Sequence, residues 1–133
     1  KPYGEAAEKR WVMPSPIPAC ARDLVVMDAV ADAEKIASLV DFCFCAVDMP
    51  KDAIRALEET YAKLECPIVS NNSAHRWTED VPMVVPEINA EHLAVIEAQR
   101  KRLGTKRGFI AVKSNCSLQM LGVNLRHHHG HIP

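Results

Sequence analysis

The chain has 133 residues, of which 48% are hydrophobic and 25% charged, and its formal net charge is −1. This length and composition predict one globular domain or part of one, and they exclude a disordered tail and a polybasic nucleic-acid-binding protein. No apolar run approaches the roughly 20 residues that a membrane span needs, so we expect neither nucleic acid nor a membrane as a partner. No signal peptide is recognisable, and we expect a chain that starts with Lys1 to be processed or a fragment.

The first half of the chain predicts two strands and two helices. Residues 1–22 carry four prolines with charges between them, which indicates loop or edge segments rather than a regular element. The apolar runs at 23–29 and 41–47 have the length of strands, and residues 33–40 can form one or two helical turns. Over residues 51–64 the apolar positions recur at steps of three and four, which predicts an amphipathic helix with Pro50 in its first turn.

The second half predicts two more strands and a helix between them. Residues 66–69 form a short strand, whereas residues 81–86 are bounded by prolines and favour a loop or an edge strand. We expect a helix that Asn89 caps, that places Leu93, Ile96 and Leu103 on one face, and that Gly104 ends. Residues 109–112 return to strand, and residues 118–121 can begin another helix.

The alternation of apolar strands and helices predicts an α/β fold with a parallel sheet. Ligands of such sheets bind beyond the carboxyl ends of the strands. Three segments that follow strands, residues 45–48, 70–73 and 114–117, are small and mostly polar. The sequence therefore predicts a ligand site at this edge of the sheet.

Cys116 lies where a predicted strand ends and a predicted helix begins. Unpaired backbone N–H groups at such a junction stabilise an anion, so they favour a nucleophilic thiolate and could hold the oxyanion that forms when it adds to a carbonyl. The alternative is a buried cysteine at an ordinary junction. The other four cysteines form no CxxC pair, and an odd total argues against a disulfide framework, so we expect a reducing cytoplasm and mostly apolar packing roles for Cys20, Cys43, Cys45 and Cys66.

Two runs, SNNSAHRWTEDVPMVVPEIN at residues 70–89 and GFIAVKSNCS at residues 108–117, resemble aspartate-semialdehyde dehydrogenase of the branch with an SNCS active-site motif. The resemblance covers roughly residues 1–118. It implies a Rossmann-like NADP-binding domain joined to a catalytic and dimerisation domain, in a homodimer or homotetramer. The implied reaction interconverts L-aspartate 4-semialdehyde and L-aspartyl 4-phosphate through a cysteine thioester, with phosphate as a co-substrate, on the way to lysine, threonine and methionine.

The resemblance also implies roles for individual residues. Cys116 is the nucleophile, Asn115 borders the substrate and the nicotinamide, and Arg76 binds the substrate phosphate, for which a guanidinium is well shaped. The loops that line the dinucleotide would be Cys45, Ala46, Val47, Ser70 and Asn71. Without the resemblance, Arg76 would be read as a loop residue that pairs with Glu79 or Asp80. His75 is expected on the surface, and Lys113 is expected to end its strand rather than to act in catalysis.

The chain also departs from the family pattern. The glycine-rich turn that holds the pyrophosphate would precede Lys1, so residues 1–115 are interpreted as part of the nucleotide-binding domain. Residues 116–133 are interpreted as the start of the catalytic helix followed by a divergent, histidine-rich tail. Its histidines, His127, His128, His129 and His131, could attract Zn²⁺ or Ni²⁺ but lack a rigid geometry, so no metal site is expected. We expect this chain alone to be inactive, and the alternative function is a catalytically silent nucleotide-binding remnant or an interaction module.

Overall fold

The structure, a computed structural model, describes residues 3–129 and the side chains of residues 3–124. It divides into two compact units, residues 1–36 and residues 37–133. No helix in the described part of the chain has both the length and the apolar composition to cross a membrane.

The first unit contains two one-turn helices, η1 (Ala7–Arg10) and α1 (Ala19–Arg22). The prediction of loop throughout residues 1–22 is therefore wrong in these two places. Pro18 directly precedes α1, where its fixed φ and its missing N–H group cost the helix nothing. A proline-rich segment can therefore still form single helical turns between its prolines.

The predicted strand at residues 23–29 is also wrong. Within it, only Val25 makes an isolated antiparallel bridge, with Ala6. The N–H group of Val26 donates to the carbonyl of Glu5 over 2.9 Å, but the pairing stops within a few residues. An apolar run forms a regular strand only where a partner strand of matching length lies beside it.

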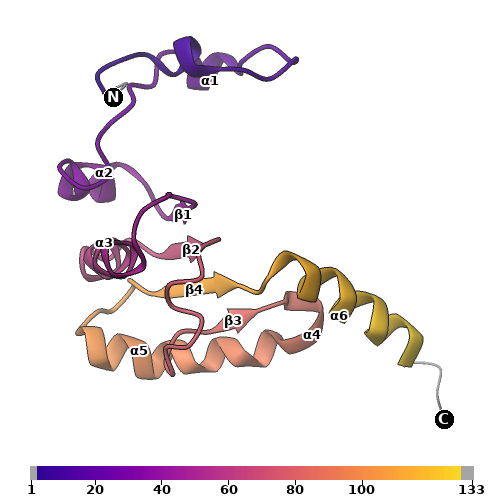
Figure 1. The fold of residues 1–133 in the computed structure, drawn as a ribbon. Helices are drawn as coiled ribbons and strands as arrows, with labels where there is room; N and C mark the ends of the chain where they lie inside the picture. Colours follow the sequence, from indigo (N-terminus) through magenta and orange to yellow (C-terminus); the bar gives the residue numbers. More distant parts are fainter. Residues whose placement is uncertain (1–2, 130–133) are drawn as a thin grey trace. The chain divides into compact units, whose positions relative to one another are not determined.

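The second unit is built on a four-stranded sheet in the order β1-β2-β4-β3, and all three strand pairs are parallel (Figure 1). The strands are β1 (Cys43–Cys45), β2 (Ile68–Ser70), β3 (Met83–Val84) and β4 (Ile110–Lys113). The α/β class and the parallel sheet are confirmed. The proline-bounded segment is confirmed as an edge strand of only two residues, since β3 ends the strand order.

Helix α2 (Ala33–Leu39) precedes β1, and α3 (Lys51–Lys63) follows it, both as predicted. Helix α3 begins directly after Pro50 and packs on β2 and β4. Its buried residues are Ile54, Leu57, Glu58, Tyr61 and Ala62. One of these, Glu58, is a carboxylate on an otherwise apolar stripe, and it is only 1% exposed.

The helical segment between β3 and β4 starts earlier than predicted and is interrupted. It consists of α4 (Pro86–Asn89), η2 (Ala90–Val95) and α5 (Ile96–Leu103). Pro86 occupies the first position of α4, which suits its fixed φ. The amide of Asn89 makes no helix cap; it accepts from the N–H of Val85 over 2.8 Å and donates to the carbonyl of Met83 over 3.0 Å. Asn89 therefore ties the edge strand to the helix that follows it.

The predicted apolar face of this segment is only partly correct. Leu93 is 43% exposed, whereas the residue of α5 that is fully buried is Gln99. Gly104 ends α5 in the left-handed conformation with φ +72°, as predicted. This conformation strains any residue with a Cβ atom, which is why glycine is the usual helix stop.

Helix α6 (Cys116–His129) follows β4 and lies on the side of the sheet toward which the strand arrows point (Figure 1). The start predicted at residues 118–121 lies inside it, and the helix continues into the histidine-rich segment. The side chains of His127, His128 and His129, and His131 as a whole, lie outside the described residues. Within the described part of the chain, no three metal-binding side chains come together.

Candidate active site

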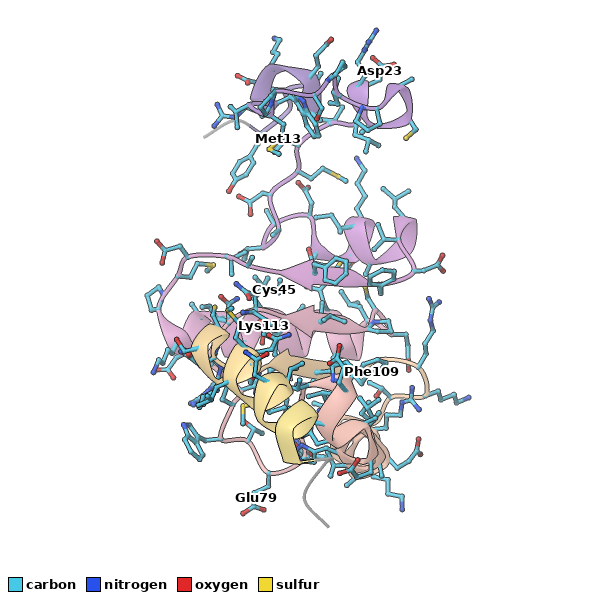
Figure 2. All side chains as sticks on the ribbon, turned by 90° about the vertical axis from the view of Figure 1, so that its right-hand side faces the viewer. Met13, Asp23, Cys45, Glu79, Phe109 and Lys113 are labelled. Atoms are coloured by element: carbon cyan, nitrogen blue, oxygen red, sulfur yellow. The ribbon has the colours of Figure 1, made fainter. Side chains whose placement is uncertain are left out.

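The carboxyl ends of the parallel strands meet at one edge of the sheet. The register pairs Cys45 of β1 with Ser70 of β2, and Ser70 with Val112 of β4, so Lys113 extends one residue beyond this row. Figure 2 shows Cys45 and Lys113 in a view turned by 90° from that of Figure 1. The three segments that the sequence singled out therefore follow neighbouring strand ends.

Cys116 is the first residue of α6, and its side chain is exposed. Asn115 shapes this start: its side-chain oxygen accepts from the N–H of Ser117 over 3.0 Å, and its carbonyl accepts from the N–H of Gln119 over 2.9 Å. These bonds are those of a helix N-cap. The alternative of a buried Cys116 is wrong, since its thiol is exposed at a helix start.

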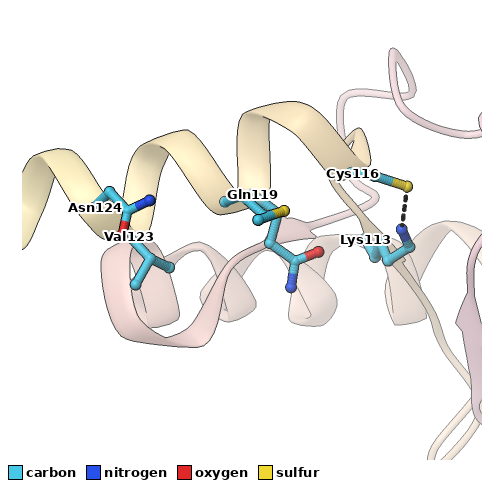
Figure 3. Close-up of a pocket in the computed structure, with 6 residues that line it drawn as sticks. Lys113, Cys116, Gln119, Val123 and Asn124 are labelled. Atoms are coloured by element: carbon cyan, nitrogen blue, oxygen red, sulfur yellow. Dashed lines mark hydrogen bonds between the residues drawn. The ribbon is translucent and has the colours of Figure 1, made fainter.

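Lys113 contacts the sulfur directly. Its Nζ donates to Cys116 Sγ over 3.1 Å, from the last residue of β4 across the turn to the first residue of α6 (Figure 3). This hydrogen bond, and then the positive charge of the same ammonium, lower the pKa of Cys116 below its usual value. The expectation that Lys113 ends its strand is confirmed, but the sequence reasoning missed its contact with the thiol. The spacing of three residues between Lys113 and Cys116, across a strand–helix turn, was the sequence feature that could have indicated this contact.

Arg76 approaches the same place from the loop after β2. Its Nε donates to the carbonyl oxygen of Lys113 over 3.3 Å, and its charge also lowers the pKa of Cys116, although less than Lys113 does. The alternative pairing with Glu79 or Asp80 is not formed among the described residues, and Asp80 binds Arg102 instead. The fold thus brings Arg76 and Cys116, 40 positions apart in sequence, to one edge of the sheet.

The residues expected to line a dinucleotide differ in their exposure to solvent. Cys45 and Ser70 are buried, whereas Ala46 and Asn71 are exposed and Val47 is half-buried. The N–H of Asn71 donates to the carbonyl of Cys45 over 2.8 Å, which joins the two strand ends. The buried members therefore shape the edge, and the exposed ones form its surface.

The buried Glu58 of α3 is hydrogen-bonded to this edge of the sheet. The hydroxyl of Ser70 donates to Glu58 Oε1, and the same hydroxyl accepts from the N–H of Asn72 over 3.0 Å. Burial, and then the hydrogen bond to Glu58, raise the pKa of Cys45 to about 11, so this thiol is protonated at neutral pH. The sequence reasoning missed this role of Glu58. Its position among the apolar residues of the buried face of α3 could have indicated a buried carboxylate.

The prediction that His75 lies on the surface is wrong. Its side chain is only 2% exposed, with Nδ1 3.1 Å from Thr78 Oγ1 and Nε2 3.9 Å from Glu58 Oε2. Burial lowers the pKa of His75, and the Glu58 carboxylate only partly opposes this effect. The loop folds back over α3, where Arg55 also donates to the carbonyl of Ala74 over 2.8 Å, so His75 is enclosed while Arg76 points to the site.

An open groove of about 440 Å³ runs from the thiol along α6 (Figure 3). It is lined by Lys113, Cys116, Gln119, Met120, Val123 and Asn124. Near the sulfur the lining is cationic, and along the helix it combines two amides with two apolar side chains. Such a groove can hold a small ligand that carries a negative charge at the end near Cys116.

The thiols should differ sharply in reactivity. At pH 7 we expect iodoacetamide to modify Cys116 quickly and to leave Cys45 and Cys66 unmodified in the folded chain. Their pKa values of about 11 and about 12 leave roughly 10⁻⁴ of each as thiolate or less, and both are buried. Peptide mass spectrometry after timed labelling measures this order. Denatured chain is the control, in which Cys45 and Cys66 should label readily; equal labelling in the folded chain would contradict the assignment.

Comparison with known proteins identifies relatives of the chain. Residues 4–96 match the family model described as the NAD-binding domain of semialdehyde dehydrogenase. The chain is 36% identical over 126 residues to an aspartate-semialdehyde dehydrogenase of Archaeoglobus fulgidus, which covers 95% of the chain and 34% of that relative. It is 34% identical over 125 residues to a malonyl CoA reductase (NADP) of Metallosphaera sedula, with 94% of the chain and 33% of that relative covered.

A solved structure agrees with these relatives. The crystal structure of aspartate semialdehyde dehydrogenase with NADP from Candida albicans superimposes with a TM-score of 0.76 at 30% identity. The match covers 93% of this chain and 35% of that one. The chain therefore spans about a third of the length of the relatives that it matches.

Proposed function

The chain belongs to the semialdehyde dehydrogenase family through its NAD-binding domain, and from this we propose that it forms part of an aspartate-semialdehyde dehydrogenase. The proposed reaction is the NADP-dependent interconversion of L-aspartate 4-semialdehyde and L-aspartyl 4-phosphate. Residues 1–115 contribute part of a Rossmann-like domain, and residues 116–133 contribute the start of the catalytic helix and a divergent, histidine-rich tail. The observation that carries the proposal is the exposed Cys116 thiol, which contacts a cation at the carboxyl edge of the sheet.

The strand ends fit a dinucleotide. Ala46 and Asn71 are small and exposed at adjacent strand ends, so a ligand can approach the backbone there. Val47 lines the same surface, while Cys45 and Ser70 hold the turns in place from within the core. When bound, NADPH supplies the hydride of the reduction. The solved relative that contains NADP supports the choice of this nucleotide.

Cys116 acts as the nucleophile. In the direction of reduction, its thiolate adds to the carbonyl carbon of the acyl phosphate, and the C–O bond to phosphate breaks with its electron pair on the phosphate oxygen. Sulfur suits this role because a thioester forms readily and stays electrophilic. Asn115 positions the thiol by capping α6, which uses the N–H group of Ser117. The N–H groups of the helix start that this cap does not use would stabilise the oxyanion that forms.

Arg76 binds the phosphate. Its guanidinium lies beside Lys113 and close enough to Cys116 to lower the pKa of the thiol, so a phosphate there would lie next to the reacting sulfur. Small-molecule substrate and inorganic phosphate are thus the proposed ligands. We further propose a homo-oligomer in the cytoplasm, where free thiols such as Cys20 and Cys116 stay reduced.

Replacing Arg76 by alanine should raise the KM for phosphate by about 10- to 100-fold and change kcat less, since one charge-assisted contact is worth about 1.5–3 kcal/mol. The assay follows phosphate-dependent NADPH formation from the semialdehyde, with the protein as its gene encodes it. Arg10→Ala, an exposed arginine of η1, is the matched control and should leave this KM unchanged. A KM for phosphate that stays at the wild-type value in Arg76→Ala would refute this role.

The same assay tests the function as a whole. NADPH formation that requires both the semialdehyde and phosphate supports the proposal. A second assay follows NADPH oxidation in the direction of reduction. Activity there with a coenzyme A thioester but not with the acyl phosphate would instead indicate a function like that of the malonyl CoA reductase relative. Nucleotide binding without turnover in either assay would favour the silent alternative.

A further inference from the structure

Lys113 is held in a defined place beside the sulfur. Its backbone is part of the sheet, because it pairs with Val84 of β3, and its carbonyl oxygen accepts from Arg76. The side chain is half-buried, and from there Nζ reaches Cys116 Sγ. The lysine is therefore anchored on one side by the sheet edge and directed on the other toward the thiol.

Two charged groups lower the pKa of the Cys116 thiol among the side chains of residues 3–124. They are Lys113 from β4 and Arg76 from the loop after β2. Helix α6 contributes the amides of Gln119 and Asn124 to the groove, and these carry no charge. Of these two cations, Lys113 contacts the sulfur itself, with Nζ 3.1 Å from Sγ, while Nε of Arg76 is bonded to a carbonyl oxygen.

We propose that Lys113 is a catalytic residue of this site, whose ammonium group keeps Cys116 ionised by pairing with its thiolate. This inference rests on the proposed function, and it adds the residue that prepares the nucleophile. In the resting protein the thiol proton has passed to solvent, and the ammonium keeps all three of its own protons. An ammonium in contact stabilises a thiolate more than a helix start does alone, because the charge is whole and close.

The test measures the ionisation of Cys116 rather than turnover. The rate of alkylation of Cys116 by iodoacetamide is recorded against pH in the wild-type chain and in the variants Lys113→Met, Lys113→Gln and Lys113→Arg. Cys20, an exposed thiol in the same molecule, is the internal reference. Lys101→Met, the same substitution at an exposed lysine of α5, is the matched control.

We expect the pH midpoint of Cys116 labelling to rise in Lys113→Met and Lys113→Gln. At pH 7 the rate relative to Cys20 should fall about tenfold for each pH unit by which the midpoint comes to exceed 7, as the thiolate fraction falls. Lys113→Arg and Lys101→Met should keep a low midpoint. Added salt should raise the wild-type midpoint and affect the neutral variants less, since the contact between Lys113 and Cys116 is open to solvent.

A midpoint that stays at the wild-type value in both neutral variants would overturn the inference. Two neutral variants are included so that misfolding of one does not decide the result, and thermal melts check both. Because labelling needs neither substrate nor cofactor, the outcome is separable from the proposed function. A shifted midpoint in a protein without dehydrogenase activity would support the ion pair while refuting the enzyme.

Discussion

Replacing Cys116 by alanine is expected to abolish phosphate-dependent NADPH formation, with a loss of at least about 10⁴-fold in kcat. The reaction as proposed has no path that bypasses the thioester, so no neighbouring side chain can substitute. Serine at this position should be almost as inactive, because its hydroxyl is not ionised at neutral pH and would give an ester that accepts hydride less readily. Initial rates with the semialdehyde, phosphate and NADP measure the effect.

The structure separates this loss from unfolding. Cys116 is exposed at the start of α6, so its removal leaves no cavity, and the affinity for NADP and the melting temperature should stay close to those of the wild type. Cys20→Ala, at the other exposed cysteine, is the control and should keep full activity. Near-normal turnover in Cys116→Ala would remove this residue from the mechanism.

Local sequence patterns predicted the elements that position the site. The apolar period of α3 and the short apolar runs of β1, β2 and β4 each carry enough local signal to be recognised. Polar residues directly after these strands then predicted the edge at which Arg76 and Cys116 meet, because parallel strands end together. The family, inferred from the motifs around these two residues, is confirmed by the match to residues 4–96 and by the relatives.

What the sequence could not predict depends on tertiary contacts. His75 and Arg76 are adjacent in a polar loop, yet one is enclosed against Glu58 and the other reaches the carbonyl of Lys113. Nothing in the local pattern distinguishes them. Asn89 likewise is a residue type that often caps helices, but its side chain hydrogen-bonds to Val85 and Met83, at the edge strand, instead. Hydrogen bonds from a side chain to backbone groups of another segment cannot be predicted from local sequence propensities.

Gln99 is the strongest case of such a side chain. It lies on α5 with 0% exposure, and its amide makes three hydrogen bonds. Nε2 donates to the carbonyls of Ile110 and Asp80 over 2.9 and 2.8 Å, and Oε1 accepts from the N–H of Ile110 over 2.6 Å. The two-residue strand β3 pairs only with Val112 and Lys113 of β4, so the amide of Gln99 takes the place of a missing strand beside Ile110.

Gln99→Met should therefore destabilise the unit formed by residues 37–133 by about 2–6 kcal/mol. Methionine has nearly the same length and shape, so it fills the space but leaves the N–H and carbonyl of Ile110 buried without partners, at about 1–3 kcal/mol each. Because domains of this size are stable by only about 5–15 kcal/mol, such a loss can leave little folded protein. Urea unfolding followed by circular dichroism measures the difference in free energy.

Gln119→Met is the matched control, since Gln119 lies half-buried in the groove along α6 rather than against β4. It should change the free energy of unfolding by about 0.5 kcal/mol or less, as most surface substitutions do. Equal stability of the two variants would mean that the amide of Gln99 does not act as the partner of β4. In that case the strand that ends in Lys113, and with it the position of Lys113 beside Cys116, would depend on the pairing with β2 and β3 alone.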